Sequence, residues 1–541
     1  MSGAASAAAS NAAALKAWAE SPDGPRLCLV RGGPGSGKSR LLAWLVAESG
    51  VPVHAAVPAE GQLAVTLAWE LGRQLGYGPL GPAALTARIA ADPRPVRLVL
   101  PDLHKAGRGP ADLPAARPEA VVTELLGPLL ALPHVRLAVE AGELPVAEGT
   151  LVLDLGPGSP APAAPAPPVA PVADWRTAPA ETRERALDGA LAAGTAGELL
   201  KDPGFLVHGS PVAVTAALAD SRIAVPKRLP EIWAAAAPAL TTYGASDAER
   251  AAVLHAAALG RDARLAEYLR PLADGHRWSA AWSRPGHRVS ALALSGSGEL
   301  LTADRAGRLH RWRAADGTRL GRVTAPPGLR PIGLAAVGEG CVLALEPDGT
   351  LRPVAEAVPA EADYPSLYHN GITLASPADR PTALAADGRR IVLGDAAGRL
   401  HLWSPDRLAA GPRIGRPHRS TVTAAACLTL RETGTVLVVT GGLDGTVRLW
   451  DSTTGEVMPE PVERRAAVPT ALALAATAAG PVLTVAWSDL RLHVWRLFEG
   501  ALTTLPLLAE TDALALTPDG LAVLGGRGGT TALRLSEALT G

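Results

Sequence analysis

The stretch "RGGPGSGKSR", residues 31–40, has the residue types that bind phosphate. Glycines permit backbone conformations that other residues rarely adopt, so successive amide N–H groups can turn inward onto phosphate oxygens. Lys38 is one of only five lysines among 51 lysines and arginines, and its compact ammonium suits a narrow phosphate cradle better than a planar guanidinium does. Ser39 adds a hydroxyl that can bind Mg²⁺. The stretch therefore predicts a site for phosphate groups and a metal ion.

The same residues fit the spacing G-x-x-x-x-G-K-[ST] of the P-loop in full, from Gly32 to Ser39. An apolar, strand-like run precedes them and a helical run follows, which is the context that this motif requires. The N-terminus of that helix adds partial positive charge. The motif predicts binding of ATP or ADP, with Mg²⁺ on the Ser39 hydroxyl. The residues assigned to the nucleotide are Gly32, Gly33, Pro34, Gly35, Ser36, Gly37, Lys38, Ser39 and Arg40.

A second motif should supply an acid. "VRLVLPDLHKAG", residues 96–107, resembles the "LVLDDLH" form of P-loop ATPases, but Pro101 replaces the first Asp and leaves Asp102. Because side chains alternate along a strand, a shift of one residue points Asp102 away from Mg²⁺ if the strand stays regular, whereas a bend at Pro101 turns it back. Three interpretations stay open for Asp102: the catalytic acid on the Mg²⁺ side, an acid that positions water after loss of the Mg²⁺ partner, or a solvated turn residue.

The fourth predicted strand ends in "AVEAGELP", residues 138–145, where related ATPases carry a polar or arginine sensor. Glu140 and Ala141 stand there instead. Phosphoryl transfer depends mostly on positioning and charge stabilisation. The sequence therefore predicts weak NTPase activity, with hydrolysis affected more than binding.

Five short apolar runs separated by helical stretches position these motifs. Near-continuous apolar strands of this kind predict a parallel sheet covered on both faces, an α/β fold. The runs span residues 26–32, 51–57, 96–102, 134–140 and 150–156. The Pro/Ala-rich residues that follow can form neither a helix nor a sheet ladder, so they predict a linker.

An all-α domain is expected next, since Ala, Leu, Arg and Glu recur there with helical spacing. Its residues Gly209, Ser210 and Pro211 resemble the Gly-x-Pro motif of the STAND class, signal-transduction NTPases with numerous domains. That resemblance implies that Pro211 packs on the adenine, and a plain helix–turn–helix junction is the alternative. It also makes His255 and His276 candidates for the phosphate-sensing histidine of a winged-helix-like domain.

The rest of the chain repeats a turn and a strand, as in "DGTVRLW" and "AGRLHLW", about every 45 residues. The repeat resembles the WD-repeat β-propeller, an all-β fold, and six blades are favoured. "HRWSAAWS", residues 276–283, is expected to add the missing outer strand of the last blade and so close the ring. A seventh blade would have to lie within residues 354–380.

Two blades carry parts of the hydrogen-bond network of the WD family. In blade four the matching residues are His418, Thr440, Asp444, Trp450 and Asp451. Blade one keeps His287 and Trp312 but has Ala306 where the family places an Asp. The resemblance implies structural roles for these residues.

Composition narrows the function classes. The formal net charge is −1 and no long basic run occurs, so nucleic acid is not an expected partner. No apolar run is long enough to span a membrane and no signal peptide is recognisable, which predicts a cytoplasmic protein. Cys28, Cys341 and Cys427 each lie in an apolar run and are expected to be buried.

The order of the motifs along the whole chain resembles a bacterial, actinobacterial-like STAND protein with an AAA+/NB-ARC-like P-loop domain. The resemblance implies a signalling switch: nucleotide state gates self-association or partner output, and the propeller senses or binds a protein partner. The alternative is a WD-repeat scaffold whose degenerate NTPase domain binds nucleotide only structurally. The predicted parts are a flexible N-terminal segment or helix (1–25), the P-loop domain (26–156), the linker (157–173), the helical domain (174–275) and the propeller (276–541).

Overall fold

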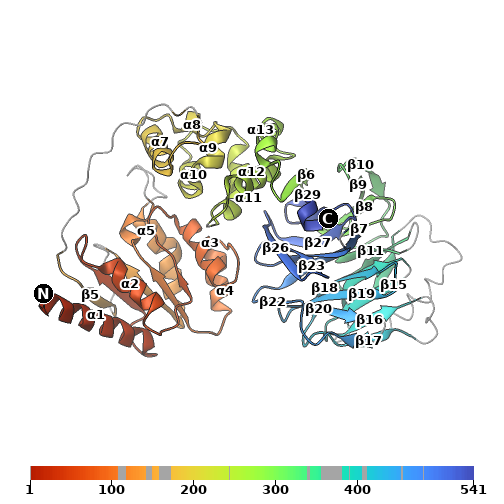
Figure 1. The fold of residues 1–541 in the computed structure, drawn as a ribbon, viewed down its shortest axis with the longest axis horizontal. Coiled ribbons are helices and arrows are strands. Elements are labelled where there is room, and N and C mark those ends of the chain that lie inside the picture. Colours follow the sequence, from red (N-terminus) through yellow and green to blue (C-terminus); the bar gives the residue numbers. More distant parts are fainter. Residues whose placement is uncertain are drawn as a thin grey trace. The chain divides into compact units, whose positions relative to one another are not determined.

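The chain forms two compact units, Met1–Asp247 and Ala248–Gly541 (Figure 1). The computed structural model describes residues 2–540 except 108–116, 142–148, 158–171, 173, 243, 338–340, 355–379, 389, 405–410, 453–454 and 479. The predicted linker lies almost entirely outside the described residues. Each unit is considered by itself.

The first unit contains a five-stranded sheet in which every pairing is parallel. This confirms the predicted α/β class with a parallel sheet. The strand order is β2-β3-β4-β1-β5. The strands are β1 (Leu27–Arg31), β2 (Ala55–Ala56), β3 (Val96–Leu100), β4 (Val135–Glu140) and β5 (Leu151–Asp154). Because the carboxyl ends of parallel strands meet at one edge, the segments that follow β1, β3 and β4 lie next to one another.

Helices cover both faces of this sheet, as its apolar strands require (Figure 1). Side chains of β4 alternate between two cores: Leu137 packs in one and Ala138 in the other. The first core is completed by α3 and α4, and the second by α1 and α2. The helices of this part are α1 (Ser2–Glu20), α2 (Lys38–Ala47), α3 (Ala64–Gln74), α4 (Pro82–Ala90), η1 (Leu103–Lys105), α5 (Pro118–Val121), η3 (Val122–Leu126) and α6 (Gly127–Leu130).

Seven helices follow between the sheet and the propeller in the described part of the chain: α7 (Ala180–Ala192), α8 (Ala196–Leu199), α9 (Pro203–His208), α10 (Pro211–Leu218), α11 (Leu229–Leu240), α12 (Asp247–Ala258) and α13 (Ala263–Ala273). The helices α7 to α11 belong to the first unit. They meet its sheet domain at the start of α3, where Leu63, the residue before the helix, packs against Ala216. Arg73 of α3 also donates to the carbonyl of Pro238 at 2.8 Å.

The helix α13 and nearly all of α12 group instead with the second unit. Arg277, which directly precedes the first propeller strand, lies 3.9 Å from Glu249 of α12. The predicted boundary between helical domain and propeller, after residue 275, stays a prediction, while the boundary between the compact units follows Asp247.

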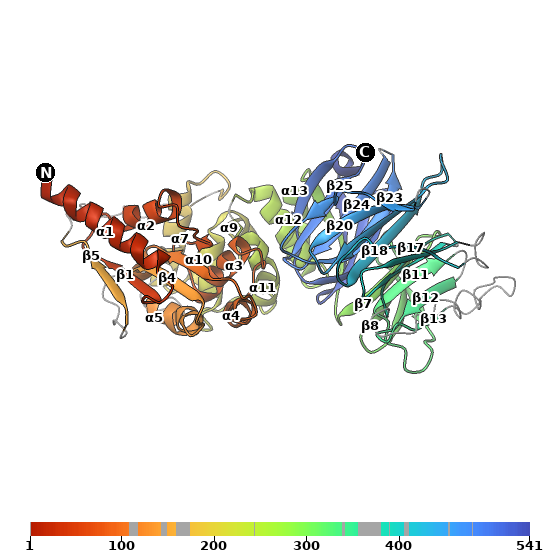
Figure 2. The ribbon, with the colours of Figure 1, turned by 90° about the horizontal axis from the view of Figure 1, so that it is seen from below.

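The rest of the second unit is a six-bladed β-propeller, which confirms the favoured number of blades. Figure 2 shows strands of the fifth blade side by side. The first blade consists of β7 (Val289–Leu294), β8 (Glu299–Asp304), β9 (Leu309–Arg313) and β10 (Arg319–Val323). The second consists of β11 (Gly333–Val337), β12 (Cys341–Leu345) and β13 (Leu351–Pro353). The third consists of β14 (Pro381–Asp387), β15 (Arg390–Asp395), β16 (Leu400–Trp403) and β17 (Arg413–Gly415).

The last three blades complete the ring. The fourth blade consists of β18 (Val422–Thr429), β19 (Val436–Gly442), β20 (Thr446–Asp451), β21 (Glu456–Val457) and β22 (Glu463–Arg464). The fifth consists of β23 (Pro469–Thr477), β24 (Gly480–Trp487), β25 (Arg491–Arg496) and β26 (Ala501–Pro506). The sixth consists of β27 (Thr511–Leu516), β28 (Leu521–Gly526), β29 (Gly529–Leu535) and β6 (Trp278–Pro285). A short helix, α15 (Glu537–Thr540), follows β29 along the chain. Most of the stretch that a seventh blade would need, residues 355–379, lies outside the described residues.

The ring closes where β6 pairs antiparallel with β29, with Trp282 opposite Ala532. This confirms that the segment before blade one supplies the outer strand of the last blade. A second closing contact joins the last blade to the first: Arg288, directly before β7, donates to both carboxylate oxygens of Asp512 in β27, at 2.5 and 2.6 Å. The two ends of the propeller sequence therefore hold each other, and β6 covers the outer edge of β29.

Four of the six pairs of neighbouring blades are joined by hydroxyl groups on their innermost strands, within the described residues. Each of these side chains donates to a backbone carbonyl of the next blade, over 2.6–2.8 Å. The pairs are Ser290 with Pro331, Thr382 with Val422, Thr423 with Pro469, and Thr470 with Thr511. These bonds repeat around a central channel of about 240 Å³ lined mainly by alanine and leucine.

Candidate functional site

The P-loop forms the turn between β1 and α2. The strand ends at Arg31 and the helix begins at Lys38. Gly32 has a φ of +146° and Gly37 a φ of +94°, which side chains with a Cβ rarely adopt. A Cβ on Gly32 would also lie 2.5 Å from the Ser36 hydroxyl. The backbone conformation therefore favours glycine at this position, and a larger side chain would also displace the Ser36 hydroxyl.

Two polar groups face the inside of this turn. The Ser36 Oγ is buried and has no hydrogen-bond partner among the described residues. The Lys38 side chain is 9% exposed, and its Nζ donates to the carbonyls of Gly32 and Gly33 at 2.9 and 3.0 Å. The ammonium is thus folded back over the loop by the loop's own backbone.

Glu140 is the acid beside this turn. It is the last residue of β4, and the parallel pairing of β4 with β1 places it opposite Val30. Its side chain is 3% exposed. The Ser39 hydroxyl donates to its Oε2 at 2.8 Å, and the Lys38 Nζ lies 3.6 Å from its Oε1. From the sequence, Glu140 only stands where related ATPases carry a sensor; its contact with the P-loop depends on β4 being the neighbour of β1, which the sequence pattern does not specify.

Asp102 follows β3, which ends at Leu100. Its φ of +56° is in the left-handed region, so the regular strand alternation does not extend to this residue. Lys105 lies 2.7 Å from its Oδ1, and this hydrogen bond raises the pKa of the lysine. The three interpretations of Asp102 stay predictions.

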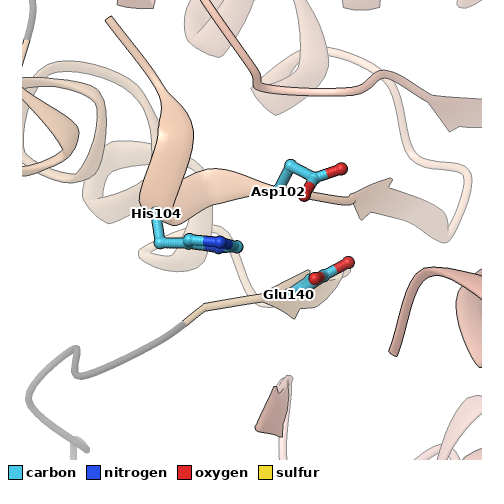
Figure 3. A group of neighbouring side chains, drawn as sticks. All are labelled: Asp102, His104 and Glu140. Carbon is cyan, nitrogen blue, oxygen red and sulfur yellow. The ribbon is translucent and has the colours of Figure 1, made fainter. Parts of the chain in front are cut away.

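The side chains of Asp102, His104 and Glu140 form a group at the ends of β3 and β4 (Figure 3). One potential metal-ligand atom from each lies within 4.8 Å of the other two. The group combines two carboxylates with an imidazole, and carboxylate oxygens are the protein ligands that Mg²⁺ prefers. Since Glu140 also contacts Ser39, the group is continuous with the P-loop.

Pro211 is the first residue of α10. Gly209 follows the end of α9, and the Ser210 hydroxyl accepts a hydrogen bond from Ala213 N at 3.4 Å as the N-cap. Proline is favoured at the first helical position, so this local structure is also that of a plain helix junction. Within the described residues, no hydrogen bond, ion pair or apolar core cluster joins Pro211 to the P-loop, and its contact with adenine stays a prediction.

The other two candidates, His255 and His276, lie in the second unit. His255 is 3% exposed within α12, and neither ring nitrogen has a hydrogen-bond partner among the described residues. Burial lowers the pKa of His255 and also that of His276. Their phosphate-sensing role stays a prediction.

The network of blade four is present in part. His418 Nε2 lies 2.9 Å from Thr440 Oγ1, and its Nδ1 lies 3.2 Å from Asp444 Oδ1. The indole N–H of Trp450 is buried and has no partner among the described residues. Burial lowers the pKa of His418. These groups brace the blade rather than face a ligand.

Blade one differs from the expected pattern. His287 is exposed and takes part in none of the described hydrogen bonds, so its expected structural role is wrong. The acid of the turn is Asp304, which accepts from the backbone N–H groups of Ala306 and Arg308 at 2.9 and 3.0 Å. Trp312 does take its expected part by donating to Thr302 Oγ1 at 2.9 Å.

The three cysteines are buried thiols, as expected. Burial raises the pKa of Cys28 to about 12. Within the described part of the chain, no helix combines the length and the hydropathy that crossing a lipid bilayer requires.

No protein-family model matches the chain, and no curated protein matches it. Solved structures to which it is similar include the WD40 propeller domain of Doa1, at 14% identity over 47% of this chain and 96% of that one, with a TM-score of 0.33. Another is the WD40 repeats of RRP9, at 12% identity over 48% and 98%, with a TM-score of 0.33. The computationally designed Ika8 protein matches at 22% identity over 46% and 71%, with a TM-score of 0.29.

Proposed function

We propose that this protein is a nucleotide-dependent switch that binds ATP or ADP with Mg²⁺ at the P-loop and a protein partner at the propeller. The observation that carries the nucleotide part is the turn after β1, where Lys38 folds over a glycine-rich loop directly at the start of α2. The proposal treats the two units as separate binding modules of one chain.

The residues of the turn suit a nucleotide phosphate tail. The backbone N–H groups at the start of α2 have no partner within the helix and carry partial positive charge. The Lys38 ammonium can exchange its two carbonyl partners for phosphate oxygens. The buried Ser36 hydroxyl offers one more polar group inside the loop. When bound, Mg²⁺ would neutralise part of the phosphate charge next to Ser39.

The propeller suits protein binding because it is a rigid ring that presents loops. Its closure by strand pairing and by the Arg288–Asp512 ion pair fixes the blades. Loops on a fixed scaffold are the usual place for binding residues. A partner can shift the switch only by binding one of its two states more tightly than the other.

The test of the nucleotide site is Lys38→Ala. Titration with a fluorescent ATP analogue and Mg²⁺ should show a loss of affinity on the order of 10- to 100-fold, since a charged hydrogen-bond donor to phosphate is removed. Lys38→Arg should not restore the affinity fully, because the guanidinium is bulkier. The matched control is Lys16→Ala, which removes an exposed ammonium from α1. Unchanged binding by Lys38→Ala would refute the assignment.

A second candidate function is a WD-repeat scaffold whose N-terminal unit binds nucleotide only for stability. The observation that favours it is Pro101 in place of an acid after β3. Under both proposals hydrolysis is slow, below about 1 s⁻¹, so turnover does not separate them. The separating measurement is whether nucleotide changes the assembly state.

A further inference from the structure

We infer that Glu140, at the end of β4, is the acid that holds Mg²⁺ beside Ser39, in place of the acid missing at the end of β3. The inference rests on the proposed binding of Mg²⁺-nucleotide at the P-loop. It concerns which carboxylate serves the metal ion, and it assigns that task to a strand that the sequence motif did not single out.

The first support is topological. The strand β4 lies between β1 and β3, so its carboxyl end is adjacent to the P-loop. Glu140 pairs with Val30, two residues before Gly32. By contrast, β3 does not pair with β1 in this sheet. An acid on β4 therefore needs no bend in the backbone to reach the start of α2.

The second support is the contact with Ser39. The serine hydroxyl, which the motif assigns to Mg²⁺, donates to Glu140 Oε2 at 2.8 Å. A metal ion on the serine oxygen would therefore lie beside a carboxylate. The second carboxylate oxygen, Oε1, is 3.6 Å from the Lys38 ammonium. One side chain thus connects the metal-binding hydroxyl with the phosphate-binding ammonium.

The third support is burial. Taking a carboxylate out of water is costly unless charge and hydrogen bonds compensate. Glu140 is almost fully buried, and its compensating groups in the described structure belong to the P-loop: the Ser39 hydroxyl and the Lys38 ammonium. When phosphate draws the ammonium away, a divalent cation is the natural replacement for that charge.

Asp102 is less suited to the same task. It follows Pro101 on a left-handed residue, and its carboxylate is engaged by Lys105 at 2.7 Å. Its side chain is also more exposed than that of Glu140, at 18%. Because Mg²⁺ keeps several of its water molecules in protein sites, Asp102 and His104 are placed to bind such water rather than to replace Glu140.

The experiment measures how much Mg²⁺ strengthens nucleotide binding. The fluorescent ATP analogue is titrated into the full chain with Mg²⁺ and with EDTA, and the ratio of the two affinities is the metal gain. Glu140→Gln, which keeps the shape and removes the charge, should reduce the gain by about tenfold or more. In EDTA this variant should bind the analogue as tightly as wild type or more tightly, because a negative charge next to the phosphates is gone.

Two comparisons isolate the effect. Glu48→Gln removes a carboxylate at the other end of α2 and should keep the wild-type gain. Asp102→Asn should lose less of the gain than Glu140→Gln does, because Asp102 is placed to hold only water bound to the ion. Binding of Mn²⁺ to the protein–nucleotide complex, followed by electron paramagnetic resonance, gives a readout that does not depend on the fluorescent group and should be weakened by Glu140→Gln.

The outcomes separate the two proposals. If wild type binds no nucleotide, the proposed function fails. If wild type shows a metal gain that Glu140→Gln retains, or that Asp102→Asn loses to the same extent or more, the inference about Glu140 is overturned. Should Glu140→Gln fail to fold, Glu140→Asp keeps the charge but withdraws it by one methylene; a gain unchanged by this variant would also overturn the inference.

Discussion

At the scale of single residues, two neighbouring strands end differently: a proline follows β3, and an acid is the last residue of β4. Pro101 directly follows the last residue of β3, and Asp102 then adopts a left-handed conformation. Glu140 instead continues a regular strand up to the P-loop. A buried carboxylate with a compensating ammonium is a feature that active sites share with structural ion pairs. The metal gain described above distinguishes these two roles.

A second residue-scale prediction concerns Pro211. If its ring packs on the adenine, Pro211→Ala should weaken binding of ATP and ADP and leave binding of inorganic triphosphate unchanged, by competition against the fluorescent analogue. We expect a loss of about tenfold, the size of one lost apolar contact.

Pro203→Ala is the matched control, because Pro203 is the first residue of α9 just as Pro211 is of α10. Both substitutions remove a proline from the first position of a helix, where proline is favoured, so they should affect the stability of the helix start to a similar extent. Equal loss of ATP and triphosphate binding by Pro211→Ala would remove the adenine contact and leave a helix junction.

At the scale of elements, α12 is unusual because all residues from Ala251 to Ala258 are buried, His255 included. Burial lowers the pKa of His255 below its ordinary value. The unfolded chain therefore takes up a proton at a higher pH than the folded chain does. Stability contributed by the neutral imidazole is present above the unfolded pKa of about 6.5 and is lost as pH falls through and below it.

His255→Leu should remove this part of the pH dependence. Between pH 7.5 and pH 5.5 the urea midpoint of unfolding should fall less in the variant than in wild type, and at pH 7.5 the two should be close, because the ring nitrogens have no described hydrogen bonds to lose. His287→Leu, at an exposed histidine, should keep the wild-type slope. If the urea midpoint of His255→Leu fell as much between these pH values as that of wild type, His255 would not be neutral in the folded chain.

At the scale of the whole molecule, the propeller is a closed ring and the N-terminal unit has its own cores. Closure through β6 covers the outer edge of β29, and an uncovered strand edge can pair with other chains. The prediction at this scale is that nucleotide-controlled self-association takes place through the N-terminal unit and that the propeller restrains it.

The corresponding prediction compares the full chain with residues 1–247 by sedimentation velocity, each with ATP and with ADP, in the presence of Mg²⁺. The shorter chain should assemble with ATP more readily than the full chain does, and neither should assemble with ADP. Lys38→Ala in the shorter chain should abolish the response to ATP. If the shorter chain stays monomeric while the full chain assembles, the propeller is the assembly platform, and the scaffold function is favoured.

The sequence by itself determined the features that depend on neighbouring residues. The P-loop spacing, the apolar strands and the repeated turns are local patterns, because backbone conformation and side-chain alternation are set within a few residues. The parallel sheet, the six blades and the strand before blade one that closes the ring followed from these patterns and were confirmed. The boundaries of the parts and the nucleotide contacts of Asp102 and Pro211 remain predictions.

Only the tertiary structure decided which distant residues meet. Glu140 and Ser39 are 101 residues apart, and their hydrogen bond depends on β4 being the neighbour of β1. In blade one the tertiary structure also corrected the sequence pattern, since Asp304 and not residue 306 is the acid of the turn and His287 lies exposed. Strand order and the turning of a side chain at a strand end are set by packing of the whole sheet, because many strand orders satisfy the same local pattern.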